Sequence, residues 1–212
     1  MWRFPYLHYF FEEVTLLFTL KDDKLKFIRI NVDYIEALHD ADQEVPYSTN
    51  RYENKPYIGL LISHDGHPYA IPLTSAKPKH VNWKDESKDR FLIYEMVGSE
   101  VDLGENAIIK PDKNQGSEVK HILSAIDLKK MIPVRSEVIQ LVDFNPSISD
   151  DDETRKYKEL LTKEFRFCIK IKQEILDRAS ELYDSIRGGK KIRFCCNFIH
   201  LETVSDNYVP KD

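Results

Sequence analysis

The chain has 212 residues, and 42% of them are hydrophobic, so one folded domain of ordinary size is expected and disorder is not. Its 31 Lys and Arg against 36 Asp and Glu give a net charge of -5, which excludes a uniformly basic nucleic-acid-binding domain but not local basic patches. Three cysteines, two adjacent and one distant, form neither a disulfide framework nor a Cys-x-x-Cys metal site, which favours a reducing cytoplasm. No apolar run reaches the roughly 20 residues of a membrane span, so no membrane partner is expected.

The first 24 residues are rich in aromatic side chains but lack the pattern of a signal peptide. Pro5, His8 and the pair Glu12-Glu13 interrupt them, and there is neither a basic lead nor a small-residue cleavage site. They either pack on the body as an amphipathic segment or lie upstream of the functional start. We treat residues 1–24 as an N-terminal extension whose role is open.

The first regular elements are expected between residues 25 and 97. Alternating apolar and polar residues predict strands at 25–31, 57–63, 69–73 and 91–97, and helical spacing predicts a short helix at 32–40. Asp65-Gly66 is a turn signal between two apolar runs, so the second and third strands should form an antiparallel hairpin. The fourth strand is expected beside this hairpin.

The second half of the chain has the strongest helical periodicity. Residues 98–118 are rich in Gly, Asp, Asn and Pro and predict a surface excursion, and residues 118–126 predict a short helix. Apolar residues three or four apart over 150–187 predict one long amphipathic helix, or two in line, with acids at its start and Gly188-Gly189 as its stop. A strand at 191–198 and a polar tail should follow.

A reactive loop is suggested just beyond the strand at 69–73. Thr74, Ser75, Lys77, Lys79 and His80 share one strand exit, and clustered hydroxyls and cations suit a phosphate anion. Composition alone rates an ordinary solvated basic loop above this reading, because no motif of fixed spacing is present.

A second basic cluster comprises Arg187, Lys190, Lys191 and Arg193 and contains no acid. It either follows a nucleic-acid backbone or is a charged helix end, and the two readings are about equally supported. His64 and His67 flank Asp65 but have no firm third ligand, so neither a metal nor a cofactor is expected.

Several stretches taken together resemble the endoribonuclease toxins of type III toxin-antitoxin systems, the ToxN and AbiQ proteins of phage abortive infection. They occur in family order over nearly all of residues 25–202. The stretches are LKFIRINVDYIEAL (25–38), RYENKPYIGLLI (51–62), YAIPLTSAKPKH (69–80), DLKKMIPV (127–134), EFRFCIKIKQEI (164–175) and CNFIHLE (196–202). No single stretch is a strict signature, and the joint match carries the resemblance.

The resemblance implies an α+β fold: a compact, strongly curved antiparallel β-sheet like that of the MazF and Kid toxins, surrounded by helices that include a long one in the C-terminal half. It implies a single toxin domain at 25–202, preceded by the extension and followed by a polar tail at 203–212. It also implies sequence-selective, metal-independent cleavage of single-stranded RNA in the cytoplasm. A small repeat-derived RNA antitoxin, processed by the toxin from its precursor, would inhibit cleavage of cellular mRNA within a closed ring of alternating protein and RNA.

Carried over residue by residue, the resemblance places Thr74, Ser75 and Lys77 on the family's active-site loop and Tyr52 on a tyrosine that precedes it. Ala76 stands where relatives often have proline, which alters loop stiffness and not chemistry. We expect RNA contacts from Lys55, Lys79 and His80 and from the second basic cluster of Arg187, Lys190, Lys191 and Arg193.

These residues suit the chemistry of RNA cleavage. RNA carries its own nucleophile, the 2'-hydroxyl, so scission needs a base, an acid for the 5'-oxygen and donors for the charged phosphorane. Lys77 would stabilise the phosphorane or assist proton transfer, Ser75 and Thr74 would orient the phosphate, and Tyr52 would position a base or the ribose. The products would carry 2',3'-cyclic phosphate and 5'-hydroxyl ends. The general base stays open, with His80 as an outside candidate.

Two alternatives from other classes remain at this point. One is a non-catalytic RNA-binding module in which the same loops grip phosphates and nothing is cut. The other is a serine-lysine hydrolase that uses Ser75 and Lys77. Neither explains the order of the matching stretches from 25 to 202.

Overall fold

A computed structural model describes residues 25–47, 58–64, 67–112 and 116–210. These described residues divide into two compact units, one with those up to position 72, those at 129–142 and those from 183 on, and the other with those at 73–128 and 143–182. We call them unit 1 and unit 2. Strand β3 (His67–Ser75) and helix α4 (Lys172–Arg187) each contribute residues to both units.

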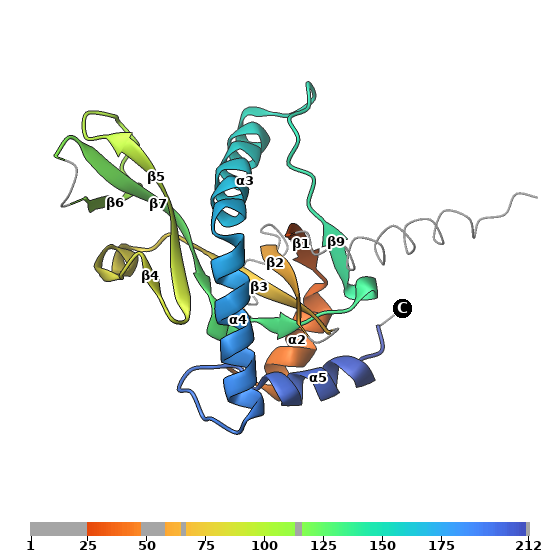
Figure 1. Cartoon of the computed structure of the whole chain (residues 1–212). Helices are drawn as coiled ribbons and strands as arrows, with labels where there is room; N and C mark the ends of the chain where they lie inside the picture. Colours follow the sequence, from red (N-terminus) through yellow and green to blue (C-terminus); the bar gives the residue numbers. More distant parts are fainter. Residues whose placement is uncertain (1–24, 48–57, 65–66, 113–115, 211–212) are drawn as a thin grey trace, which may run out of the picture. The chain divides into compact units, whose positions relative to one another are not determined.

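Unit 1 is built on antiparallel strands in the order β3-β2-β1-β9, and β8 also pairs with β3 (Figure 1). Its elements are β1 (Lys26–Ile30), α2 (Val32–Ala41), β2 (Ile58–His64), the first part of β3, β8 (Ile132–Pro133), the 3-10 turn η3 (Ser136–Val138), β9 (Ile139–Leu141) and α5 (Phe198–Asn207). The strand at 25–31, the helix at 32–40 and the hairpin around residues 65–66 are thereby confirmed.

Helix α2 begins at a side-chain cap and buries one face in the core of unit 1. The Asn31 side chain accepts a hydrogen bond from the Tyr34 backbone N–H at 3.2 Å, which satisfies one of the free donors at a helix start. Tyr34, Ile35 and Leu38 are fully buried. The Tyr34 hydroxyl donates to the Pro133 carbonyl at 2.8 Å and forms a second 2.8 Å bond with the Ser205 hydroxyl, so α2 and α5 share one polar contact inside an apolar core.

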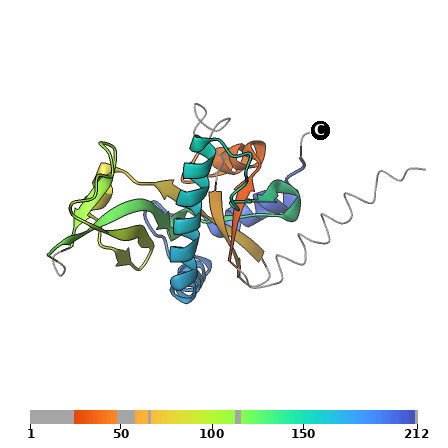
Figure 2. The same ribbon diagram turned by 90° about the horizontal axis from the view of Figure 1, so that it is seen from above.

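Unit 2 holds the end of β3 in the strand order β4-β5-β7-β3, with β6 also paired to β7 (Figure 2). Its elements are the 3-10 turn η1 (Pro78–Asn82), β4 (Glu86–Ser87), β5 (Arg90–Gly98), β6 (Ile108–Pro111), β7 (Glu118–Asp127), α3 (Asp152–Lys170) and most of α4; the 3-10 turn η2 (Leu128–Lys130) follows β7. The longest ladder joins β5 to β7 from Arg90↔Asp127 to Gly98↔Glu118 and is interrupted by a bulge at Ile93/Tyr94.

The expected long helix consists of two helices that meet at Ile171. Asp151 caps the start of helix α3, since its side chain accepts a hydrogen bond from the Thr154 N–H at 2.7 Å, and α4 ends at Arg187. The glycine stop is confirmed: Gly189 has a φ of 86°, and the N–H of Lys190 returns to the Ser185 carbonyl at 3.0 Å. A side chain at Gly189 would be strained at this φ.

Four expectations for the elements are wrong. Residues 118–126 form strand β7 instead of a helix, and because β7 pairs with both β3 and β5, the strand at 91–97 does not lie directly beside the hairpin. Residues 191–197 form turns instead of a strand. The polar tail begins with helix, since α5 runs to Asn207 from a cap at Asn197 whose side chain accepts from the His200 N–H at 3.3 Å.

The mixed class of helices around antiparallel strands is confirmed, with four α-helices in the described residues. The strong, MazF-like curvature of the sheet stays a prediction. None of the helices in the described ranges is long and apolar enough to cross a membrane.

Candidate active site

The predicted reactive loop lies where β3 leaves the sheet of unit 2. Thr74 and Ser75 are the last residues of β3 and stand opposite Ala125 and Ser124 of β7. Thr74 is half-buried, whereas Ser75 and Lys77 are exposed. The structure therefore brings the predicted hydroxyls and the lysine together at one strand end, where a rigid ladder fixes the backbone and the side chains face solvent.

His80 lies beneath this loop with none of its surface exposed. Its Nδ1 accepts the backbone N–H of Lys77 at 3.2 Å, and its ring packs on Trp83 with 4.4 Å between centroids. Burial lowers the pKa of His80, and the charges of Lys79 and Lys77 lower it further, so the ring is neutral at pH 7. A buried ring cannot contact phosphate directly, so the expected RNA contact is corrected: His80 positions the backbone of Lys77.

A cationic surface surrounds Trp83, next to this loop. The Lys79 ammonium lies 5.5 Å and the Arg90 guanidinium 4.4 Å from the centre of the Trp83 ring. Lys110 donates to the Trp83 carbonyl at 2.5 Å and to the Asp85 carboxylate at 2.6 Å, which fixes the turn that carries the tryptophan. Aromatic rings among cations are typical of surfaces that hold single-stranded nucleic acid, and residue-type patterns had not singled out Trp83 or Arg90.

The second basic cluster belongs to unit 1 and occupies the turns between α4 and α5. Arg187, Lys190, Lys191 and Arg193 are all exposed. Beside them Phe194 is 55% exposed and is the one non-glycine residue of the described chain with a positive φ, at 60°. The Arg193 guanidinium lies 4.5 Å from its ring centre.

Two predicted residues, Tyr52 and Lys55, lie outside the described residues.

Two polar residues that the sequence interpretation missed are buried close to the loop. Ser124 is 2% exposed, and Glu164 of α3 is 5% exposed. Burial raises the pKa of Glu164 to about 7, and the Ser124 hydroxyl beside it offsets part of this rise. The available signal was the helical spacing, which puts Glu164 on the same stripe as Leu161 and Cys168.

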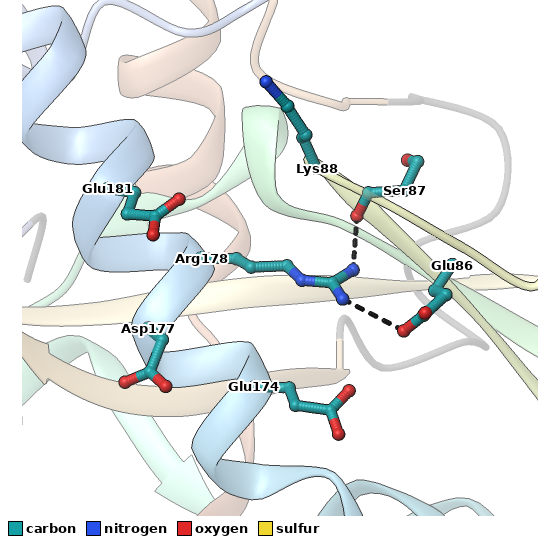
Figure 3. A pocket seen from close by; sticks show the side chains of 7 residues that line it. All are labelled: Glu86, Ser87, Lys88, Glu174, Asp177, Arg178 and Glu181. Atoms are coloured by element: carbon teal, nitrogen blue, oxygen red, sulfur yellow. Dashed lines mark hydrogen bonds and ion pairs between the residues drawn. The ribbon is translucent and has the colours of Figure 1, made fainter.

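A surface pocket of unit 2 is lined mainly by acidic side chains, in contrast to the two basic clusters. Arg178 of α4 reaches β4, donating to the Ser87 carbonyl at 2.5 Å and to the Glu86 carboxylate at 3.0 Å (Figure 3). The lining consists of Glu86, Ser87, Lys88, Glu174, Asp177, Arg178 and Glu181. Four carboxylates against two cations repel a phosphate backbone, so this pocket is not the place where RNA would bind. Within the described ranges, no three His, Cys, Asp or Glu side chains gather in a metal-binding arrangement.

Comparisons with known proteins agree on one family. A family model described as "Toxin ToxN, type III toxin-antitoxin system" matches residues 26–206. The relative named Endoribonuclease ToxN from Pectobacterium atrosepticum is 31% identical over 180 residues, covering 84% of this chain and 90% of the relative. The protein of the same name from Bacillus thuringiensis subsp. kurstaki is 25% identical over 198 residues, covering 90% of this chain and 87% of the relative.

Solved structures give the same picture. One described as "A processed non-coding RNA regulates a bacterial antiviral system" is 27% identical, with a TM-score of 0.64, and covers 86% of this chain and 98% of its own. The structure of AbiQ, a lactococcal anti-phage endoribonuclease, shares the fold with a TM-score of 0.60 at 18% identity, over 86% of this chain and 96% of its own. The family model spans most of the chain and a relative exceeds 30% identity, so the chain belongs to the ToxN family of type III toxin-antitoxin toxins.

Proposed function

We propose that this chain is a sequence-selective endoribonuclease toxin that cleaves single-stranded RNA without a metal ion. The observation that carries the proposal is the end of β3, where Ser75 and Lys77 stand exposed and Lys77 is held by a buried histidine. Two relatives named as endoribonucleases support the reaction class.

The mechanism follows from what these residues offer a phosphodiester. The 2'-hydroxyl of the substrate attacks the adjacent phosphorus, and the Lys77 ammonium stabilises the charge that develops on the phosphorane. Ser75 and Thr74 orient the phosphate, and Tyr52 positions the ribose or a base. The neutral, buried ring of His80 fixes the backbone at Lys77, so the ammonium starts from a preorganised position.

The partner that we propose is a small structured RNA derived from tandem repeats. It would occupy the active-site loop as a trapped product and would form a closed ring of alternating protein and RNA in the cytoplasm. The similar solved structure described as "A processed non-coding RNA regulates a bacterial antiviral system" supports this class of partner. The cationic surface around Trp83 suits such a ligand because it offers charge for phosphates and a ring face for bases.

The test is to incubate the purified chain with long single-stranded RNA and to map the new ends. We expect cuts at a restricted sequence, with 2',3'-cyclic phosphate upstream and 5'-hydroxyl downstream. Ser75→Ala should fold normally but lack toxicity when it is expressed without its RNA. Its control is Ser87→Ala, because the Ser87 hydroxyl bonds to Asp89 in the turn between β4 and β5. RNA bound but recovered uncut would favour the non-catalytic binding module, and a fully toxic Ser75→Ala would remove this serine from the site.

A further inference from the structure

Glu164 is a buried carboxyl group without a cation. Its side chain is 5% exposed, and no ion pair to it occurs among the described residues. The charged groups on the elements packed against it are engaged with one another: Glu95 of β5 is bonded to His121 of β7 at 3.0 Å and to Lys163 of α3 at 2.8 Å. Burying a carboxyl without compensation is unfavourable, so its presence calls for a role other than packing.

The sheet register connects this carboxyl to the active-site loop. Ser75 and Ser124 are directly opposite each other in the β3–β7 ladder, so their side chains lie on the same face of the sheet. Cβ atoms of such pairs stand about 4.5–5.5 Å apart, within reach for their hydroxyls to exchange a hydrogen bond. Helix α3 covers this face, where Lys163 bonds to Glu95 at 2.8 Å.

Ser124 stands between the two groups. It is 2% exposed, and its hydroxyl oxygen has no aligned hydrogen-bond partner in the described structure, although it lies close enough to Glu164 to lower the pKa of that carboxyl. A buried hydroxyl without a fixed partner is free to turn toward either neighbour. The order Ser75, Ser124, Glu164 therefore runs from solvent to the interior through groups that can each hold and pass a proton.

We propose that Ser75, Ser124 and Glu164 form a proton relay in which Glu164 takes up the proton of the substrate's 2'-hydroxyl. This inference rests on the proposed ribonuclease function and supplies its missing base. As the 2'-oxygen bonds to phosphorus, its proton passes to Ser75 Oγ, the Ser75 proton passes to Ser124 Oγ, and the Ser124 proton passes to the Glu164 carboxylate. The bond from phosphorus to the 5'-oxygen breaks, and the 5'-oxygen takes a proton from Lys77 or water. Solvent exchange resets both groups. Glu164 touches no substrate atom and is thus a positioning residue for Ser75.

The ionisation of Glu164 suits its role as the final proton acceptor of the relay. A carboxyl with a pKa near 7 is partly ionised at neutral pH and can accept a proton there. The Cys168 thiol, one turn further along α3, has its pKa raised by burial and by Glu164, so it stays neutral and does not compete.

The test is the pH dependence of single-turnover cleavage between pH 5 and 9 by the full chain, with an RNA that the wild type cuts. Wild-type rates should rise with pH through about 7 and then level off. Glu164→Gln keeps the shape of the side chain but cannot take up a proton, and should lose this limb and about 100-fold or more in rate. Glu159→Gln, an exposed position on the same helix, is the matched control and should keep both.

Ser124→Ala provides the second variant, since it interrupts the relay without touching the carboxyl. It should show the same altered profile, and the double variant should be no slower than either single one, because both changes break one path. Glu164→Gln or Ser124→Ala with an unchanged pH limb and a rate within a few-fold of Glu159→Gln would overturn the relay. If Glu164→Gln does not fold, Ser124→Ala decides. If the wild type cuts RNA and both variants behave like Glu159→Gln, the relay is wrong and the ribonuclease function stands. If the wild type cuts no RNA, the proposed function is wrong as well.

Discussion

Lys77 combines an exposed ammonium with a backbone N–H that is held by the buried ring of His80. A preorganised charge at a developing oxyanion contributes roughly 3–4 kcal/mol, so Lys77→Ala should lower the cleavage rate by several hundred-fold while the protein still folds. Single-turnover rates on a short RNA measure this. Lys84→Ala, an exposed lysine of the same unit, should change the rate little.

The variant Lys77→Arg separates two possible roles of the ammonium. Arginine keeps the positive charge but stays protonated throughout the accessible pH range. Near-normal cleavage by this variant would show that charge stabilisation is sufficient. A loss as large as that of Lys77→Ala would point to proton transfer or to a geometry that only lysine satisfies.

Glu164 should make stability depend on pH in a direction opposite to that of an ordinary surface carboxylate. Its pKa rises from 4.5 to about 7 in the folded chain, so its contribution is fully present below about pH 4.5 and is lost as pH rises through 7. At about 1.4 kcal/mol per pKa unit, Glu164→Gln should gain up to about 3 kcal/mol over the wild type at pH 8 and little at pH 4.5. Urea unfolding at both pH values tests this, and equal gains at the two would contradict a titrating carboxyl.

At the scale of elements, α5 is tied to β3 through one carboxylate. Glu202 accepts hydrogen bonds from the Tyr69 hydroxyl at 2.6 Å and the Tyr183 hydroxyl at 2.8 Å, all within unit 1. Glu202→Ala leaves two largely buried phenols without this partner and should lower the free energy of unfolding by about 1–3 kcal/mol. Thermal unfolding measures the loss. His200→Ala, exposed on the same helix, should stay within about 0.5 kcal/mol of wild type.

The elements that the sequence predicts correctly have apolar residues that the fold buries. In α2 the helical spacing matches the buried face, in β1 and β5 the apolar runs are buried, and the caps and glycine stop of the helices are readable as residue types. Strand β7 was mistaken for a helix because it lies between β3 and β5 and buries residues 122–126 in succession, which removes the alternation of a half-exposed strand. Helix α5 was missed because its apolar pattern is weak: Ile199 is 40% exposed, and Ser205 is one of its three buried residues, although Asn197 was a usable cap signal.

Some residues of the candidate site were predictable from the sequence and others were not. Ser75 and Lys77 were predictable because they are neighbours in sequence at a strand exit. Ser124 and Glu164 were not, since only the β3–β7 register and the packing of α3 bring them near Ser75, and both depend on contacts distant in sequence. The burial of His80 was likewise hidden, because a histidine in a lysine-rich loop is expected to be exposed.

At the scale of the whole molecule, the net charge of -5 argues against tight RNA binding only if charge is averaged over the surface. Replacing Lys190, Lys191 and Arg193 together by glutamine should weaken antitoxin binding and reduce the slope of log K against log salt by about 2, at about 0.7 per phosphate contact. Cleavage of short substrates should be less affected.

The matched control for this triple variant is the replacement of Lys156, Lys170 and Lys172 on α3 and α4 by glutamine, which removes the same charge elsewhere. Affinity is measured over a range of salt concentrations. If the triple variant at 190–193 binds with unchanged affinity and slope, antitoxin RNA runs elsewhere and this cluster is a solvated helix end.

The proposed mechanism predicts that RNA cleavage by the whole protein needs no metal ion. Excess EDTA should leave cleavage intact, because the ribose supplies the nucleophile and protein groups supply charge and proton transfer. Activity that disappears with EDTA and returns with added magnesium or zinc would contradict the mechanism.

Tyr69, in the first half of β3, packs against Phe198 of α5 with 6.0 Å between ring centres, and Phe198 and Leu201 are fully buried in unit 1. The strand that ends in Ser75 therefore rests on a helix that is distant in sequence, since Tyr69 and Glu202 are 133 residues apart. Unit 1 cannot close its core until α5 is present, so folding of this unit should be slow, because the contact that joins β3 to α5 closes a long loop.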